Sequence, residues 1–111
     1  MPRQRIDYAN TCLYKIVCKD LNHKELYIGH TTDFSKRKAE HKKTCLKSYS
    51  HRHNLKVYQY IRDNGGWDNF DMIMIERIPC ADKLEACKIE RRYIEQHQAS
   101  LNVYIPTRTK Q

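Results

Sequence analysis

Two tyrosines near the start of the chain have the spacing of residues that act together. Tyr14 follows Cys12-Leu13, and Tyr27 begins the run Tyr27-Ile28-Gly29-His30-Thr31, which leads into a strongly basic segment. That segment contains Arg37 and His41. Two phenols, a guanidinium and an imidazole form a set of side chains that can act on a phosphate ester.

Arg37 and His41 have the spacing of neighbours on one helix. Side chains at positions i and i+4 point the same way, so we expect a phosphate held by the guanidinium to lie within reach of the imidazole. Arginine suits this place because its planar fork stays charged and meets phosphate oxygens two at a time. The alternative for Arg37 is a further surface base in a basic helix.

Three strands are predicted to position these residues. The segments from about Thr11 to Cys18 and from Leu26 to Gly29 are rich in Tyr, Ile, Val and Leu, and the polar residues between them indicate a β-hairpin. A third strand is predicted from Phe70 to Ile78. Because this segment is apolar on both faces, we expect it at the centre of the sheet.

Three helices are predicted around the strands. The first begins near Asp33, which can cap its first turn, and continues through His41 with Phe34 and Ala39 facing inward. The other two helices cover residues 54–63, ended by Asn64-Gly65-Gly66, and the segment from a capping box at Asp82 and Glu85 to about Gln96.

The charge of the chain favours an anionic partner. The chain has 111 residues, enough for one domain, and a net charge of +8. Against Glu40 alone, the central segment carries the bases Lys36, Arg37, Lys38, Lys42, Lys43, Lys47, Arg52 and Lys56. Such a polarised field suits nucleic acid, whereas a solvated lysine face is the alternative.

The cysteines indicate a reducing, intracellular setting, either cytoplasm or nucleus. Five are present without a Cys-x-x-Cys pair, and an odd number argues against a closed disulfide set. Zinc held by Cys45, His51 and His53 would lack the four ligands of a zinc finger. No segment approaches the roughly 18 apolar residues of a membrane span, and the start lacks a signal-peptide core, so we expect a soluble protein without a membrane partner.

In order and spacing, these residues resemble the GIY-YIG nucleases, and within them the catalytic domains of phage-type homing endonucleases. Cys12-Leu13-Tyr14 is similar to the first half of the name motif, with Cys and Leu in place of Gly and Ile, and Tyr27-Ile28-Gly29 matches the second half letter for letter. Arg37 and His41 resemble the helical Arg and His of the family, Glu90 its metal-binding glutamate, and Asn102 the asparagine after the last helix. Their joint order makes a chance match improbable.

The resemblance implies an α+β fold, with a small, three-stranded, mainly antiparallel sheet flanked by about three helices. It divides the chain into a basic N-terminal arm (residues 1–10), a nuclease domain (residues 11–104) and a basic tail (residues 105–111). The implied activity is a metal-dependent DNA endonuclease that leaves 5′-phosphate and 3′-hydroxyl ends.

Glu90 is the one carboxylate that we assign to a metal. A lone hard carboxylate, completed by phosphate oxygens and waters, commonly holds magnesium, so we expect one Mg²⁺ or Mn²⁺ ion. The alternative is an exposed helical glutamate paired with Arg91 or Arg92.

The tyrosines are the expected catalysts of proton transfer. The ordinary pKa of tyrosine is about 10, so a phenol can accept a proton from water only where cations and hydrogen bonds stabilise the phenolate. By resemblance Tyr14 activates the water, Tyr27 orders the network and Arg37 stabilises the phosphate. The alternative for both phenols is simple packing in a core.

The remaining candidates are expected around this centre. His30 belongs to the rim of the site, and Asn102 holds either the turn after the last helix or the active-site network. The residues expected to contact DNA are Lys36, Lys38, Lys42, His51, Arg52 and His53.

Two other functions are compatible with the sequence. A catalytically silent nucleic-acid-binding module would bind without cleaving, and an intracellular interaction domain would do neither. Because related enzymes usually carry a separate DNA-reading module, an enzyme of this length is expected to act on duplex or branched DNA as a homodimer or with a targeting partner.

Overall fold

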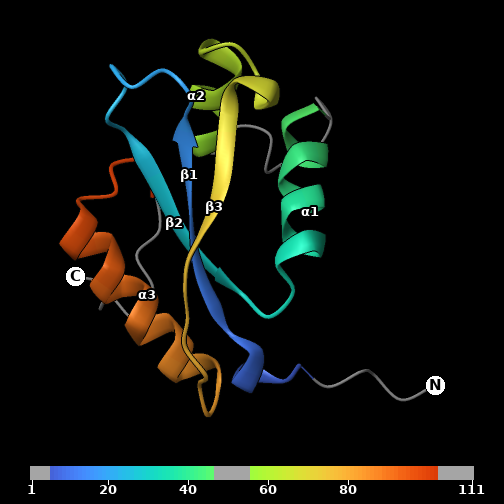
Figure 1. Ribbon diagram of the computed structural model, residues 1–111, viewed down its shortest axis with the longest axis vertical. Coiled ribbons are helices and arrows are strands. Elements are labelled where there is room, and N and C mark those ends of the chain that lie inside the picture. The colour runs from blue at the N-terminus through green and yellow to red at the C-terminus, as the bar shows by residue number, and fades with distance from the viewer. Residues whose placement is uncertain (1–5, 47–55, 103–111) are drawn as a thin grey trace.

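The chain folds into a three-stranded antiparallel sheet with helices on both faces. Figure 1 shows the computed structural model, which describes residues 6–46 and 56–102. The elements are η1 (Tyr8–Asn10), β1 (Cys12–Cys18), β2 (Leu26–Thr31), α1 (Phe34–Leu46), α2 (Lys56–Asp63), η3 (Trp67–Asn69), β3 (Phe70–Arg77) and α3 (Lys83–His97). The predicted α+β class, with three strands and three helices, is confirmed.

The strand order is β2-β1-β3, and β1 pairs antiparallel with both neighbours. The prediction that the third strand is central was therefore wrong, because β3 is an edge strand. Its apolar pattern has a different cause: Phe70 and Met72 pack on one face of the sheet, while Ile75 packs on the other. Helices cover both faces of the sheet, so a strand can be apolar on both sides even though it has a neighbouring strand on only one edge.

Alternation along the strands divides the core in two. Tyr14 and Ile16 pack with Tyr58 and Ile61 of α2, whereas Leu13 and Ile28 pack with Ile94 of α3. Figure 1 shows α1 and α3 on opposite sides of the sheet. A residue of α3 can therefore meet a residue of α1 only around an edge of the sheet.

Local capping explains where the helices begin. Asp33 accepts a hydrogen bond from the Lys36 N–H at 3.1 Å, as predicted, and Asp82 accepts one from the Glu85 N–H at 2.9 Å. The Glu85 side chain reaches back to the N–H of Ala81 rather than to the cap itself. These contacts satisfy donors that the first helical turns leave unpaired.

The inward face of α1 differs from the prediction. Ala39 is exposed, and the side chains that α1 buries are those of His41 and Cys45. Phe34 packs against the same core, as expected. The helix therefore turns its imidazole, and not its alanine, toward the sheet.

All five cysteines are free, and four of them are buried. Buried free cysteines of this kind serve as small apolar residues of the core. Within residues 6–46 and 56–102, no helix is long and apolar enough to cross a membrane.

Candidate active site

Three buried polar side chains are hydrogen-bonded in a row between the sheet and the helices α1 and α2. The Tyr14 hydroxyl lies 2.8 Å from Nε2 of His41, and Nδ1 of His41 lies 3.0 Å from the Tyr58 hydroxyl. Trp67 stacks on the imidazole, with ring centroids 6.4 Å apart. The position and orientation of Tyr14 are thus fixed by two other elements of the fold.

His41 is neutral at physiological pH. The imidazole is 0% exposed, and burial, together with the positive charge of Arg37, lowers its pKa from 6.5 to about 3. The expectation that His41 lies beside the phosphate needs correction, because both of its ring nitrogens are already hydrogen-bonded to tyrosine hydroxyls and the ring has no exposed surface. Its position instead lets Nε2 accept the hydrogen of Tyr14 while Nδ1–H donates to Tyr58, a chain in which each hydrogen bond reinforces the next.

This burial predicts a loss of stability in mild acid. Between about pH 6.5 and pH 3 the unfolded chain binds a proton at His41 and the folded chain does not, so stability should fall as the pH falls, by at most about 1.4 kcal/mol per pH unit. Urea denaturation of the wild type and of His41→Gln at pH 5 and pH 7 measures this. An equally steep fall in His41→Gln would contradict the assignment.

The absence of a side chain at Gly29 leaves space for the Tyr14 ring beside β2. The two residues are paired across β1 and β2, and β2 is an edge strand. A Cβ added at Gly29 would lie 2.5 Å from both Cζ and the hydroxyl oxygen of Tyr14. The phenol therefore lies directly over the glycine, and any side chain there would occupy its place.

Arg37 lies close to the two phenols. The rings of Tyr14 and Tyr27 have centroids 6.3 Å apart, and the nearby guanidinium lowers the pKa of both hydroxyls. It also donates to Oε1 of Glu40 at 3.3 Å. Tyr14 is 1% exposed and Tyr27 is half-buried, so Tyr27 is the more accessible phenol.

Glu90 reaches the same place from the other face of the sheet. Its Oε1 lies 2.7 Å from Nδ1 of His30. His30 directly follows Gly29 in β2, and its side chain lies on the face of the sheet that α3 covers. The carboxylate lies near enough to the two phenols to contribute to raising the pKa of each. The two phenols, the guanidinium and the carboxylate thus gather at the free edge of β2.

The pKa of Tyr27 reports this arrangement. Burial raises it most, the Glu90 carboxylate raises it further and Arg37 lowers it, leaving a value of about 12. Removing the negative charge in Glu90→Gln should lower the Tyr27 pKa, whereas Glu95→Gln, an exposed change on the same helix, should not. Titration of ¹³C-labelled tyrosine by NMR measures both, and an unchanged Tyr27 pKa in Glu90→Gln would place the carboxylate elsewhere.

The comparisons with known proteins agree with this geometry. Residues 10–104 match the family described as the GIY-YIG catalytic domain. The chain belongs to the GIY-YIG family. Its structure is similar to that of a mutant of the catalytic domain of the intron endonuclease I-TevI, with a TM-score of 0.69 and 22% sequence identity over 89% of this chain and 98% of that one. None of the curated proteins matches the chain.

One further residue positions the GIY-YIG motif. The Asn102 side chain accepts a hydrogen bond from the N–H of Ile28 at 2.9 Å and donates one to the carbonyl of the same residue at 2.7 Å. This double contact binds the residue after the last helix to the middle of Tyr27-Ile28-Gly29. It therefore fixes the backbone between Tyr27 and Gly29.

The donor atoms of the GIY-YIG site decide whether it could hold a metal ion. Oε2 of Glu90 has no partner within the described ranges, and no group of three His, Cys, Asp or Glu residues there could form a protein cage. A nearly buried carboxylate held by a neighbouring histidine fits an ion completed by waters and phosphate oxygens, which is how Mg²⁺ is usually bound.

The predicted DNA contacts are only partly visible. Lys36, Lys38 and Lys42 are exposed on α1, on the helix that carries Arg37. His51, Arg52 and His53 lie outside the described residues, and so do two of the three ligands of the zinc alternative. The contribution of these residues to binding stays a prediction.

Sequence reasoning missed Tyr58 and Trp67. Helical spacing predicts only that Tyr58 is a core residue, and nothing local distinguishes a phenol that packs from one that also bonds a histidine. Trp67 lies in the η3 turn, which no periodic pattern marks. Only the packing of α1 against both α2 and η3 brings the two side chains to His41.

Proposed function

We propose that this GIY-YIG protein is a metal-dependent DNA endonuclease that hydrolyses phosphodiester bonds. The observation that supports this most is the meeting of Tyr14, Tyr27, Arg37 and Glu90 at one edge of the sheet, although they come from both of its faces. A protein that only bound nucleic acid would not need a nearly buried carboxylate beside two phenols. The basic surface of α1 suits duplex or branched DNA as the substrate.

Arg37 binds the phosphate. The guanidinium has five N–H donors, so it can keep its bond to Glu40 and still donate to phosphate oxygens. Because this bond restricts its position, less reorganisation is needed as charge grows in the transition state. Its positive charge beside the two phenols also favours the phenolate form of each tyrosine.

Tyr14 holds the attacking water. Neutral His41 accepts the phenolic hydrogen, so the lone pairs of the Tyr14 oxygen are left to Arg37 and to the water. Tyr27, the more exposed phenol, orders the water and the phosphate. Tyr58 acts through His41 and is a positioning residue.

Glu90 holds the metal, and His30 orients it. The Glu90 carboxylate would hold a divalent ion, which would supply Lewis-acid stabilisation of the phosphate oxygens and would offset the negative charge that raises the pKa of both phenols. The His30 imidazole, 2.7 Å from Oε1, leaves Oε2 as the oxygen for that ion.

We propose further that the protein works in a reducing, intracellular compartment, alone, as a homodimer or with a targeting partner.

A plasmid assay tests the proposal. The purified protein should convert supercoiled plasmid to nicked or linear DNA in Mg²⁺ or Mn²⁺ and stop when a chelator is added. Tyr14→Phe should lose this activity with its fold intact, since it removes the hydroxyl and little volume. Salt-sensitive binding without metal-dependent cleavage, on plasmid and on branched substrates, would instead identify a silent binding module.

The metal requirement tests Glu90 separately. Glu90→Gln keeps an oxygen donor but loses the charge, so it should need at least about tenfold more Mg²⁺ for the same rate. Glu85→Gln is the matched control, because Glu85 is an exposed glutamate on the same helix that accepts a hydrogen bond from the N–H of Ala81. An unchanged Mg²⁺ dependence in Glu90→Gln would remove the metal assignment.

A further inference from the structure

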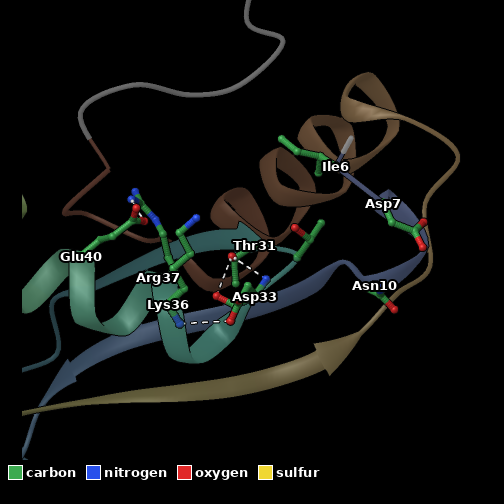
Figure 2. A pocket seen from close by; sticks show the side chains of 9 residues that line it. Ile6, Asp7, Asn10, Thr31, Asp33, Lys36, Arg37 and Glu40 are labelled. Carbon is green, nitrogen blue, oxygen red and sulfur yellow. Dashed lines mark hydrogen bonds and ion pairs between the residues drawn. The ribbon is translucent and has the colours of Figure 1, made fainter. Parts of the chain in front are cut away.

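A cavity of about 460 Å³ opens beside Arg37. Figure 2 shows it between the start of α1, the turn that leads into that helix and the segment before β1. Arg37 lines this cavity and also lies close enough to the two phenols to lower the pKa of each. The cavity is therefore next to the reaction centre, and a nucleic-acid strand bound at Arg37 would have a neighbouring nucleotide within reach of it.

The charge of the lining excludes a site for phosphate alone. The residues that line it include two cations, Lys36 and Arg37, and three acids, Asp7, Asp33 and Glu40. A cavity built for phosphate would be expected to carry an excess of positive charge. This lining suits a neutral group with hydrogen-bonding edges, attached to a phosphate that lies toward the cations.

Each of the three carboxylates uses only one of its two oxygens as a hydrogen-bond acceptor. Asp7 accepts from the N–H of Ala9, Asp33 from that of Lys36, and Glu40 from Arg37, each through one oxygen. Among the residues that the structure describes, the second oxygen of each carboxylate has no partner. The residues that line the cavity therefore carry three carboxylate oxygens free to accept a hydrogen bond, and Asn10 is a further polar residue of the lining.

We propose that this cavity binds the nucleoside next to the scissile phosphate and prefers a base with an exocyclic amino group. The inference rests on the proposed function, which places the scissile phosphate at Arg37. Carboxylates accept hydrogen bonds from the amino groups of cytosine and adenine, whereas thymine has no such donor. The cavity is thus a base-selective subsite for one position of the substrate.

Binding of mononucleotides tests the subsite without cleavage. In ¹⁵N-edited NMR titrations, the amide signals of Asn10 and Thr32 should shift with deoxycytidine and deoxyadenosine 5′-monophosphate. The affinity should be about fivefold higher than for thymidine 5′-monophosphate, the effect of one base contact. Equal affinity for all three nucleotides would overturn the proposal, and so would the same shifts with inorganic phosphate alone.

A matched pair of variants assigns the preference to the cavity. Asp7→Asn keeps the acceptor that caps η1 and replaces the spare oxygen by an amino group, so it should reduce the preference to about twofold or less. Asp20→Asn makes the same change at a similar cap in the hairpin loop, where Asp20 accepts from the Asn22 N–H at 3.0 Å, and should leave the preference unchanged. Loss of preference in both variants would contradict the assignment.

The two proposals can fail separately. Base-selective binding by a protein that never cleaves DNA would refute the nuclease and retain the subsite. Cleavage with no base preference at any position next to the cut, measured on a randomised substrate, would retain the nuclease and refute the subsite.

Discussion

Arg37→Ala should reduce the rate of DNA cleavage by about 10³-fold, the effect of removing about 4 kcal/mol of transition-state stabilisation. The guanidinium lies beside both phenols, so its loss removes the phosphate ligand and the positive charge that favours phenolate at the same time. Arg37→Lys should recover little of the rate, because an ammonium lacks the planar fork that meets two phosphate oxygens at once. Single-turnover cleavage of a labelled duplex measures both variants.

The control for Arg37 is Lys43→Ala on the same helix. Lys43 is exposed in the last turn of α1, so its loss should weaken DNA binding slightly without changing the rate at saturating protein. Circular dichroism should show both variants folded. If Arg37→Ala cleaved at the rate of Lys43→Ala, Arg37 would be one more surface base and the site would lie elsewhere.

Gly29→Ala should abolish measurable cleavage, by a factor of at least about 10², although it changes no polar group. The new methyl carbon would lie 2.5 Å from the Tyr14 oxygen, so the phenol must move and its bond to His41 at 2.8 Å must lengthen or break. Crowding of this kind typically costs about 1–3 kcal/mol of stability. Cleavage assays and urea denaturation measure the two effects.

Gly66→Ala separates loss of stability from displacement of Tyr14. Gly66 has φ 84°, so alanine is strained there, but no other atom lies within 4 Å of its added Cβ. This variant should lose about 1 kcal/mol of stability and keep its cleavage rate below its melting temperature. Equal activity of Gly29→Ala and Gly66→Ala would show that Tyr14 does not need its observed position.

Local features of the fold could be predicted because they depend on neighbouring residues. Asp33 and Asp82 begin helices by bonding N–H groups three residues ahead, and Gly65 and Gly66 follow α2 with positive φ angles. The two-residue alternation of Tyr14 and Ile16 likewise gives one face of a strand. None of these requires knowledge of the rest of the chain.

The position of β3 and the surroundings of His41 could not be predicted in this way. An apolar pattern on both faces shows that layers cover both sides of a strand, but it does not show which strands lie beside it. Similarly, spacing places Arg37 and His41 on the same side of a helix without deciding their depth. The structure leaves Arg37 partly exposed and His41 fully buried.

The sequence by itself determined the chemical groups, their order and the family, because the type and spacing of Tyr14, Tyr27, Arg37 and Glu90 are written in the chain. The tertiary structure alone decided that they meet at the edge of β2, that His41 is neutral and that a mixed-charge cavity adjoins Arg37. The reason is physical: side-chain type follows from the residue, whereas burial, electrostatic potential and open volume follow from packing between segments distant in the chain.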